Sequence, residues 1–109
     1  VKTVLLTAPS GNAPFLAELR KYRSAAFIEI LTDCGLIGIG ETYLGYHAPE
    51  IVPEIVEFFK PILVGLSDKE IDPRMLWKRM YHCCNFWARV GAGVIVFAGI
   101  EGVLWDLRG

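Results

Sequence analysis

The first third of the chain alternates between hydrophobic and polar positions or runs through β-branched residues, and both patterns are typical of β-strands. Such stretches cover residues 1–8, 24–32 and 37–42. Gly35 lies between the second and third stretches, where a hairpin turn needs a left-handed backbone conformation. We therefore expect a three-stranded antiparallel meander. A loop rich in proline and glycine, over residues 9–21, separates its first two strands.

The third predicted strand carries glycines at alternate positions. Gly38 and Gly40 share one face, whereas Ile37, Ile39 and Glu41 share the other, because side chains in a strand alternate between faces. A face made of glycine lets another element pack directly on the backbone. We expect a close neighbour on that side of the strand.

From residue 49 onward the hydrophobic period changes from two to about 3.6, which predicts helices. Pro49 suits the first turn of a first helix, and Pro61 should interrupt or kink that helix. Its buried stripe is predicted to consist of Ile51, Ile55 and Phe58 or Phe59.

A second helix is predicted from Asp72-Pro73 to about residue 86, because this pair is a strong start signal. Ser67 and Glu70 have the spacing of a capping box just before it. The residues that we expect this helix to bury are Leu76, Trp77, Met80 and Cys84.

Residues 91–109 predict a third helix that is apolar on every side, which is typical of a helix with neighbours all round. The uncharged run 90–100 is shorter than the ~20 residues that a membrane span needs. We expect part of this helix, around Val96, Val103 and Leu107, to form an exposed apolar patch together with the sheet edge near the lid loops, and this patch should bring copies together as a homo-oligomer. The competing expectation is that the helix turns inward and the chain stays monomeric, with Trp105 partly exposed.

This order of elements predicts an α+β fold, in which a three-stranded antiparallel meander is followed by a bundle of about three helices. One domain should span residues 1–109. Hydrophobic residues make up 53% of the chain, above the ~45–50% of an average globular domain. The excess indicates apolar surface for another domain or subunit.

The formal net charge is −1, with acidic and basic residues interspersed, which argues against nucleic acid or an anionic membrane as partner. The first residues lack the pattern of a signal peptide. Cys34, Cys83 and Cys84 lack metal-site spacing. We expect them to be small buried hydrophobes in a reducing cytoplasm.

Two motifs resemble those of the enolase superfamily, in its mandelate racemase and muconate lactonizing enzyme branch. Residues 33–42, DCGLIGIGET, are similar to its "DG-x-x-G-x-GE" hairpin, and residues 99–109, GIEGVLWDLRG, are similar to its "A-I-D/E-x-A-L-W-D-x-x-G" helix. The resemblance covers essentially the whole chain, but only the amino-terminal capping domain of the family.

The resemblance implies that the chemistry lies on a following (β/α) barrel, which this chain lacks. In the family the barrel supplies acidic ligands to magnesium and the bases that abstract a proton alpha to a carboxylate. The chain is therefore expected to be non-catalytic alone, with no cofactor, metal site or catalytic residue of its own. Its expected partners are the barrel domain and a small carboxylate or acid-sugar substrate, as in racemases or sugar-acid dehydratases.

The resemblance also implies that the loops around residues 8–22 and 42–48 close over the barrel mouth as a lid. The residues that we expect to contact substrate there are Tyr43, Tyr46, His47, Asn12 and Phe15. Glu41 should be structural, bonded to backbone or to an arginine such as Arg89. Glu101 and Asp106 diverge around their helix and should form salt bridges to arginines.

An alternative function is a free-standing protein–protein interaction module of the same fold, which would use its surplus apolar surface to bind a partner. A reading frame that continues into barrel-like strand–helix repeats would favour the lid domain over this module.

Overall fold

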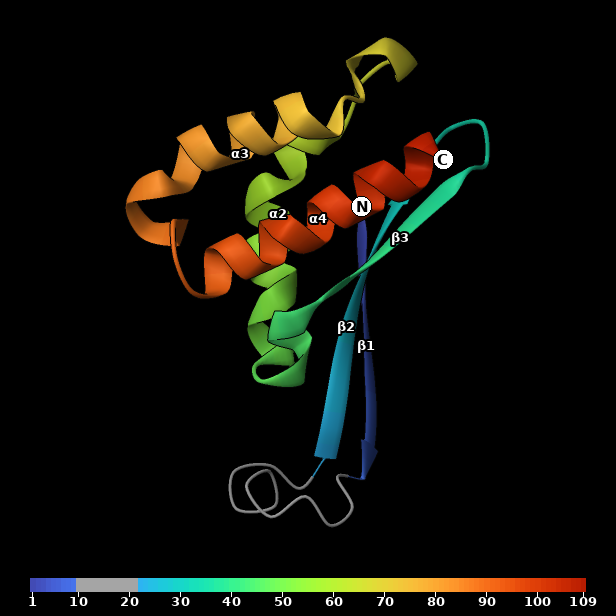
Figure 1. The fold of residues 1–109 in the computed structure, drawn as a ribbon. Coiled ribbons are helices and arrows are strands. Elements are labelled where there is room, and N and C mark those ends of the chain that lie inside the picture. Colours follow the sequence, from blue (N-terminus) through green and yellow to red (C-terminus); the bar gives the residue numbers. More distant parts are fainter. Residues whose placement is uncertain (10–21) are drawn as a thin grey trace.

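The computed structural model describes residues 1–9 and 22–109 and has the predicted α+β architecture (Figure 1). The sheet consists of β1 (Lys2–Pro9), β2 (Tyr22–Leu31) and β3 (Ile37–Thr42), in the order β1-β2-β3 and antiparallel throughout. Gly35 has φ +90° in the β2–β3 turn, as the hairpin prediction requires. Asn12 and Phe15 lie outside the described residues, as does most of the predicted first lid loop.

Helical segments follow the sheet along the chain. They are the 3₁₀ turns η1 (Tyr43–Tyr46), η2 (Pro49–Ile51) and η3 (Asp68–Glu70), and the α-helices α2 (Val52–Leu63), α3 (Pro73–Ala88) and α4 (Ala92–Arg108). The helices cover one face of the sheet, where Ala26 and Ile28 of β2 are fully buried. The lower half of the β1–β2 hairpin extends beyond them (Figure 1).

Helix α4 lies directly on the glycine face of β3, which confirms the predicted close neighbour. A Cβ atom at Gly40 would come within 2.7 Å of the Gly99 carbonyl oxygen, and one at Gly38 within 2.8 Å of the Val103 carbonyl oxygen. Gly99 makes the same close approach possible on the helix side, since a Cβ there would lie 2.9 Å from the Cβ of Thr42. The two backbones therefore touch because glycine lines both.

The predicted exposed patch on this helix is wrong, because Val96 and Val103 are completely buried and Leu107 is half-buried. The close approach to β3 lets the sheet cover one side of α4, while α2 and α3 cover others. Trp105 lies on the uncovered side and is 45% exposed. The domain itself thus supplies the neighbours that this apolar helix needs.

The buried stripe of α2 lies one residue later than predicted. Its buried residues are Val52, Val56, Phe59 and Leu63, whereas Ile51 and Phe58 are nearly half exposed. The reason is the 3₁₀ turn at Pro49–Ile51, which advances about 120° per residue instead of 100° and so shifts the helical phase. Pro61 lies inside the helix, which ends only at Leu63.

The start of α3 follows the predicted signals. The carboxylate of Asp72 accepts hydrogen bonds from the backbone amides of Arg74 (3.0 Å) and Met75 (3.4 Å), and the Ser67–Glu70 capping box caps the start of η3 just before this helix. The predicted residues Leu76, Met80 and Cys84 are buried, and Trp77 is partly buried. The helix runs to Ala88, slightly past the end that was predicted near residue 86.

The expectation of three buried cysteines holds for one of them. Cys84 is buried, but Cys34 lies exposed at the hairpin tip and Cys83 is exposed on α3. Cys83 lies next to His82 on the exposed side of the helix. The sequence shows that Cys83 and Cys84 are neighbours, but not which of them faces the core. None of the described helices is long and apolar enough to cross a membrane.

Candidate functional site

Three aromatic side chains gather where β3 ends, and we call Tyr43, Tyr46 and His47 the aromatic turn. The turn is the 3₁₀ segment η1, in which side chains three positions apart eclipse each other. Tyr43 and Tyr46 therefore stack, with ring centroids 6.1 Å apart and planes 6° from parallel. The sequence prediction placed these residues in one loop, and the structure brings their rings together.

His47 completes the cluster edge-on. Its ring centroid lies 5.0 Å from that of Tyr43 and 5.7 Å from that of Tyr46, with interplanar angles of 73° and 67°. Tyr43 is 65% exposed and His47 is also exposed, so the cluster can meet a ligand without moving.

The rest of η1 anchors the aromatic turn in the core. Leu44 and Gly45 are buried, and the buried hydroxyl of Ser24 on β2 donates a 2.7 Å hydrogen bond to the Gly45 carbonyl. A Cβ atom at Gly45 would collide with the backbone of Ala26. Leu44 and Gly45 thus hold the turn in the core, while the residues on either side of them carry its aromatic rings.

A second tie fixes the end of β3 to α4. The hydroxyl of Thr42, which is buried, donates to the carbonyl of Ile95 at 3.1 Å. Ser24 and Thr42 are functional supports that the sequence reasoning missed. The available signal was a hydroxyl residue on the inward face of each strand, where an apolar residue is expected.

The aromatic turn carries groups whose chemistry suits recognition of a ligand. Tyrosine rings offer apolar faces together with hydroxyl groups that donate and accept hydrogen bonds, and imidazole can do both. Across residues 1–9 and 22–109, no three histidine, cysteine or acidic residues form a group that could hold a metal ion. This surface can therefore bind and orient a polar ligand.

Within residues 1–9 and 22–109, the acidic residues of α4 bond to other groups than the predicted arginines. Asp106 Oδ2 accepts a 2.9 Å hydrogen bond from the backbone amide of Ile39, on the outer edge of β3. Glu101 accepts one from the indole of Trp105, at 3.3 Å. The edge amide is a fixed donor beside the carboxylate, which explains why Asp106 joins helix to sheet. Glu41 lies exposed on the opposite face of β3 from α4.

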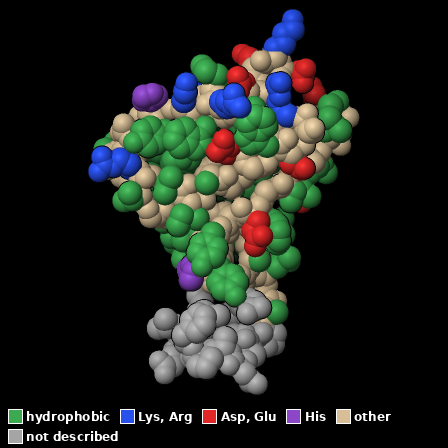
Figure 2. Space-filling view, viewed as in Figure 1, with side chains coloured by type: hydrophobic (Ala, Val, Ile, Leu, Met, Phe, Trp, Pro, Cys, Tyr) green, Lys and Arg blue, Asp and Glu red, His purple; other side chains and the backbone are tan. Residues whose placement is uncertain are grey.

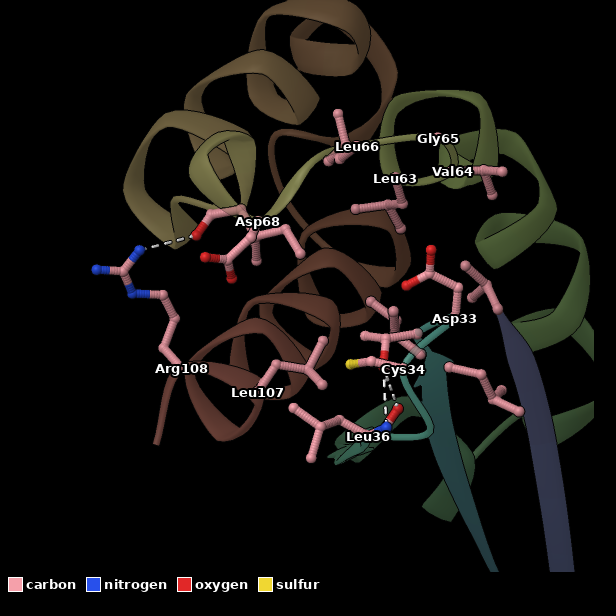
Figure 3. Close-up of a pocket in the computed structure, with 15 residues that line it drawn as sticks. Asp33, Cys34, Leu36, Leu63, Val64, Gly65, Leu66, Asp68, Leu107 and Arg108 are labelled. Carbon is pink, nitrogen blue, oxygen red and sulfur yellow. Dashed lines mark hydrogen bonds between the residues drawn. The ribbon is translucent and has the colours of Figure 1, made fainter.

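A cavity of about 610 Å³ lies at the other end of β3, away from the aromatic turn (Figure 3). It is bounded by the β2–β3 hairpin tip, the segment after α2 and the end of α4, with Leu63, Leu66 and Leu107 among its apolar walls. Asp33, Asp68 and Arg108 are its charged lining residues. The cavity thus combines apolar walls with a charged rim, and none of Tyr43, Tyr46 and His47 is among its described lining residues.

Cys34 lines this cavity near Thr32. Its sulfur lies 3.2 Å from the Thr32 hydroxyl oxygen, and this contact, with help from the Leu36 backbone, lowers the pKa of the thiol. Burial instead raises the pKa of Cys84. The two thiols should therefore differ in reactivity.

Comparisons with known proteins agree with this architecture. No protein-family model matches the chain. The chain is 34% identical over 97 residues to D-galactonate dehydratase from Verminephrobacter eiseniae, a match that covers 86% of this chain and 24% of that enzyme.

Solved structures share the fold across almost the whole chain. An enolase-superfamily member from Agrobacterium tumefaciens superposes with a TM-score of 0.80 at 22% identity, over 99% of this chain and 33% of that protein. The 3,6-anhydro-D-galactonate cycloisomerase from Zobellia galactanivorans gives 0.79 at 23% identity, over 98% and 26%. The chain thus spans about a fifth to a third of the length of the proteins that it matches.

Proposed function

The chain belongs to the enolase superfamily, as an amino-terminal domain of that fold, and from this premise we propose that it is the capping domain of a sugar-acid dehydratase or isomerase. The observation that carries the proposal is the match over 86% of the chain to a D-galactonate dehydratase of which it spans 24%. The remaining length of such an enzyme leaves room for a (β/α) barrel as the partner of this domain.

We assign substrate recognition to the aromatic turn. Tyr43 and His47 are exposed, while Leu44 and Gly45 hold the turn in the core. Stacked tyrosine rings suit the C–H face of a sugar acid, and their hydroxyl groups suit its oxygens. Asn12 and Phe15 remain part of this proposal as residues of the first lid loop, outside the described part of the chain.

The magnesium ion and the bases of the family chemistry belong, in this proposal, to the barrel. The described residues of this chain do not fit a magnesium site, since they contain no group of three potential ligands. We therefore derive no metal-dependent step from this chain, and expect it to be non-catalytic alone.

The test uses the full-length enzyme that contains this domain, assayed for loss of water from a panel of acids that includes D-galactonate and D-mannonate. Tyr43→Ala and His47→Ala should raise KM by roughly tenfold or more, equivalent to about 1.4 kcal/mol of binding, and change kcat less. Met75→Ala, exposed on α3, is the matched control. Unchanged KM in both aromatic-turn variants would contradict the lid role.

The alternative function, a free-standing interaction module, is favoured by one observation: Leu31, Ile37 and Ile39 share the side of the sheet that points away from the helices and are exposed. Mapping the reading frame separates the two functions. A continuation into strand–helix repeats supports the capping domain, and a stop at Gly109 supports the module.

A further inference from the structure

Helix α3 and the bend that follows it present a basic face to solvent. Residues 73–100 contain no aspartate or glutamate, and their cationic residues are Arg74, Lys78, Arg79 and Arg89. All four are exposed, on the side of the helix opposite its buried residues. Figure 2 shows lysine and arginine side chains along the top of the molecule, where Figure 1 places α3. The nearly balanced net charge of the whole chain therefore conceals a surface on which cations are gathered.

The carboxyl-terminal end of this basic face also exposes apolar side chains. Phe86 is 85% exposed and Val90 is 74% exposed. Trp87 lies beside them and packs edge-on against Phe58 of α2, with ring centroids 5.1 Å apart. Phe86, Trp87 and Val90 line a hollow of about 310 Å³ together with Arg89. Apolar walls and a cation therefore meet in one recess.

The bend that carries this hollow is tight because glycine forms it. Gly91 has φ +78°, a conformation that other residues rarely adopt. A Cβ atom at Gly93 would collide with the Cβ of Ala88, so the start of α4 lies directly against the last turn of α3. The hollow is thus held by the packing of the two helices and needs little rearrangement to receive a ligand.

Acidic residues border the basic face at its amino-terminal end. They are Asp68, Glu70 and Asp72, with Glu101 on α4. The capping-box hydrogen bonds and, to a smaller degree, the charge of Arg79 lower the pKa of Glu70. Arg74 lies 5.8 Å over the ring of Trp105, whose indole donates a hydrogen bond to Glu101. These two arginines are therefore partly balanced by nearby carboxylates.

Lys78 and Arg89 carry the positive charge that is left unbalanced. Within the described part of the chain, neither has an ion-pair or hydrogen-bond partner. On the flank toward α2 the acids are Glu54 and Glu57, and Glu57 is paired with Lys60 at 3.2 Å. The uncompensated cations thus lie over the carboxyl-terminal half of the face, next to the hollow.

We propose that the carboxyl-terminal half of α3 and the bend after it bind an acidic segment of a partner protein, with one apolar side chain of that segment in the hollow. Carboxylates of the segment would pair with Lys78 and Arg89. Aromatic walls beside an arginine are typical of the residues that dominate binding at protein interfaces. The inference does not depend on the proposed enzymatic role.

The shape of the surface favours a single segment over a flat anionic membrane. The turn η3 stands out above the other end of α3 (Figure 1), and it carries Asp68 and Glu70 toward any broad negative surface. A segment along the other half of the helix avoids these acids. From Lys78 to Val90 the helix extends about 18 Å, which an extended peptide covers with about six residues.

Fluorescence anisotropy with a labelled synthetic peptide of about eight residues, in which glutamates surround one phenylalanine, tests the proposal. The peptide should bind this chain with a dissociation constant on the order of 100 µM, and added salt should weaken the binding. Lys78→Glu and Arg89→Glu should each weaken it about fivefold or more. Lys2→Glu is the matched control, because it makes the same change of charge on exposed β1. Thermal midpoints check that every variant folds.

Phe86→Ala tests the hollow separately from the charges. This variant should bind the peptide severalfold more weakly, but it should bind a peptide with alanine in place of the phenylalanine as the unchanged chain does. Absence of peptide binding at millimolar concentration would overturn the proposal, and so would equal losses in Lys2→Glu and Arg89→Glu. Binding to phosphatidylglycerol vesicles without binding to the peptide would also overturn it, since the face would then fit a lipid surface.

Discussion

Gly99 and Gly102 occupy the same helix, yet their surroundings give opposite expectations for alanine. A Cβ at Gly99 would lie 2.9 Å from the Thr42 Cβ and 3.2 Å from the Glu41 carbonyl oxygen, whereas nothing lies within 4 Å of one at Gly102. We expect Gly102→Ala to raise the free energy of unfolding by up to about 1 kcal/mol, through helix propensity alone.

Gly99→Ala should instead lower it by roughly 1–3 kcal/mol, because α4 must move away from β3. Denaturant unfolding of both variants measures the difference. Equal effects of the two substitutions would mean that the close packing of α4 on β3 does not exist in solution.

Cys34 should react with iodoacetamide faster than Cys83 at neutral pH. The Thr32 hydroxyl lowers the pKa of the Cys34 thiol, so its thiolate forms at lower pH than that of an ordinary exposed cysteine. Mass spectrometry of the alkylated peptides gives the rate at each pH.

Thr32→Val should move the pH profile of Cys34 upward, and Thr32→Ser should preserve it. Cys84 provides the slow reference, because burial raises its pKa. A Cys34 profile unaffected by the loss of the Thr32 hydroxyl would contradict the assigned cause.

For single residues, the sequence predicts the environment best at positions where the backbone geometry requires glycine. Gly35 and Gly40 were predicted for a turn and for a close approach, and both occupy such positions. The partner of Asp106 was not predictable, since it is a backbone amide 67 positions earlier in the chain. A pattern of charged residues indicates possible ionic partners, but it does not indicate which backbone amides will donate to a carboxylate.

At the scale of the element, the aromatic turn depends on one buried hydroxyl. Ser24→Ala would leave the buried Gly45 carbonyl without the 2.7 Å hydrogen bond from Ser24 and should cost about 1–3 kcal/mol of unfolding free energy. The near-ultraviolet circular dichroism of the tyrosines should weaken as well, because the stacked rings lose their support.

Thr7→Ala is the control, since Thr7 pairs with Ser24 across the sheet but is exposed. Its effect should remain within about 0.5 kcal/mol. The assigned anchoring role fails if Ser24→Ala is as mild as this control.

The order and type of the elements followed from periodicity, but the phase of α2 did not. A 3₁₀ turn and an α-helix both accept Pro49 near their start, and the difference between them decides whether Ile51 or Val52 faces the core. That choice depends on how the turn meets β2, which is tertiary information. The stacking of the rings in the aromatic turn also depends on a 3₁₀ segment, η1, which the hydrophobic pattern did not predict.

At the scale of the whole molecule, protection against hydrogen exchange should follow the layers. Amides of residues 28–31 and 95–104 should exchange slowly, since they lie in the strand and helix at the centre of the core. Amides of residues 5–8 should exchange faster, because this part of the hairpin extends beyond the helices (Figure 1). Mass spectrometry after timed deuteration measures both; uniform protection would contradict the layered core.

The seam between β3 and α4 also has a consequence in time. Its hydrogen bond from Ile39 to Asp106 joins residues 67 positions apart, so a long loop must close before the seam forms. Contacts of this separation slow folding relative to a helical bundle of similar size. During synthesis on a ribosome, the glycine face of β3 emerges early, and it can be covered only after the last turns of α4 have been made. The nascent sheet therefore remains uncovered, and open to chaperones, until nearly all of these residues have been synthesised.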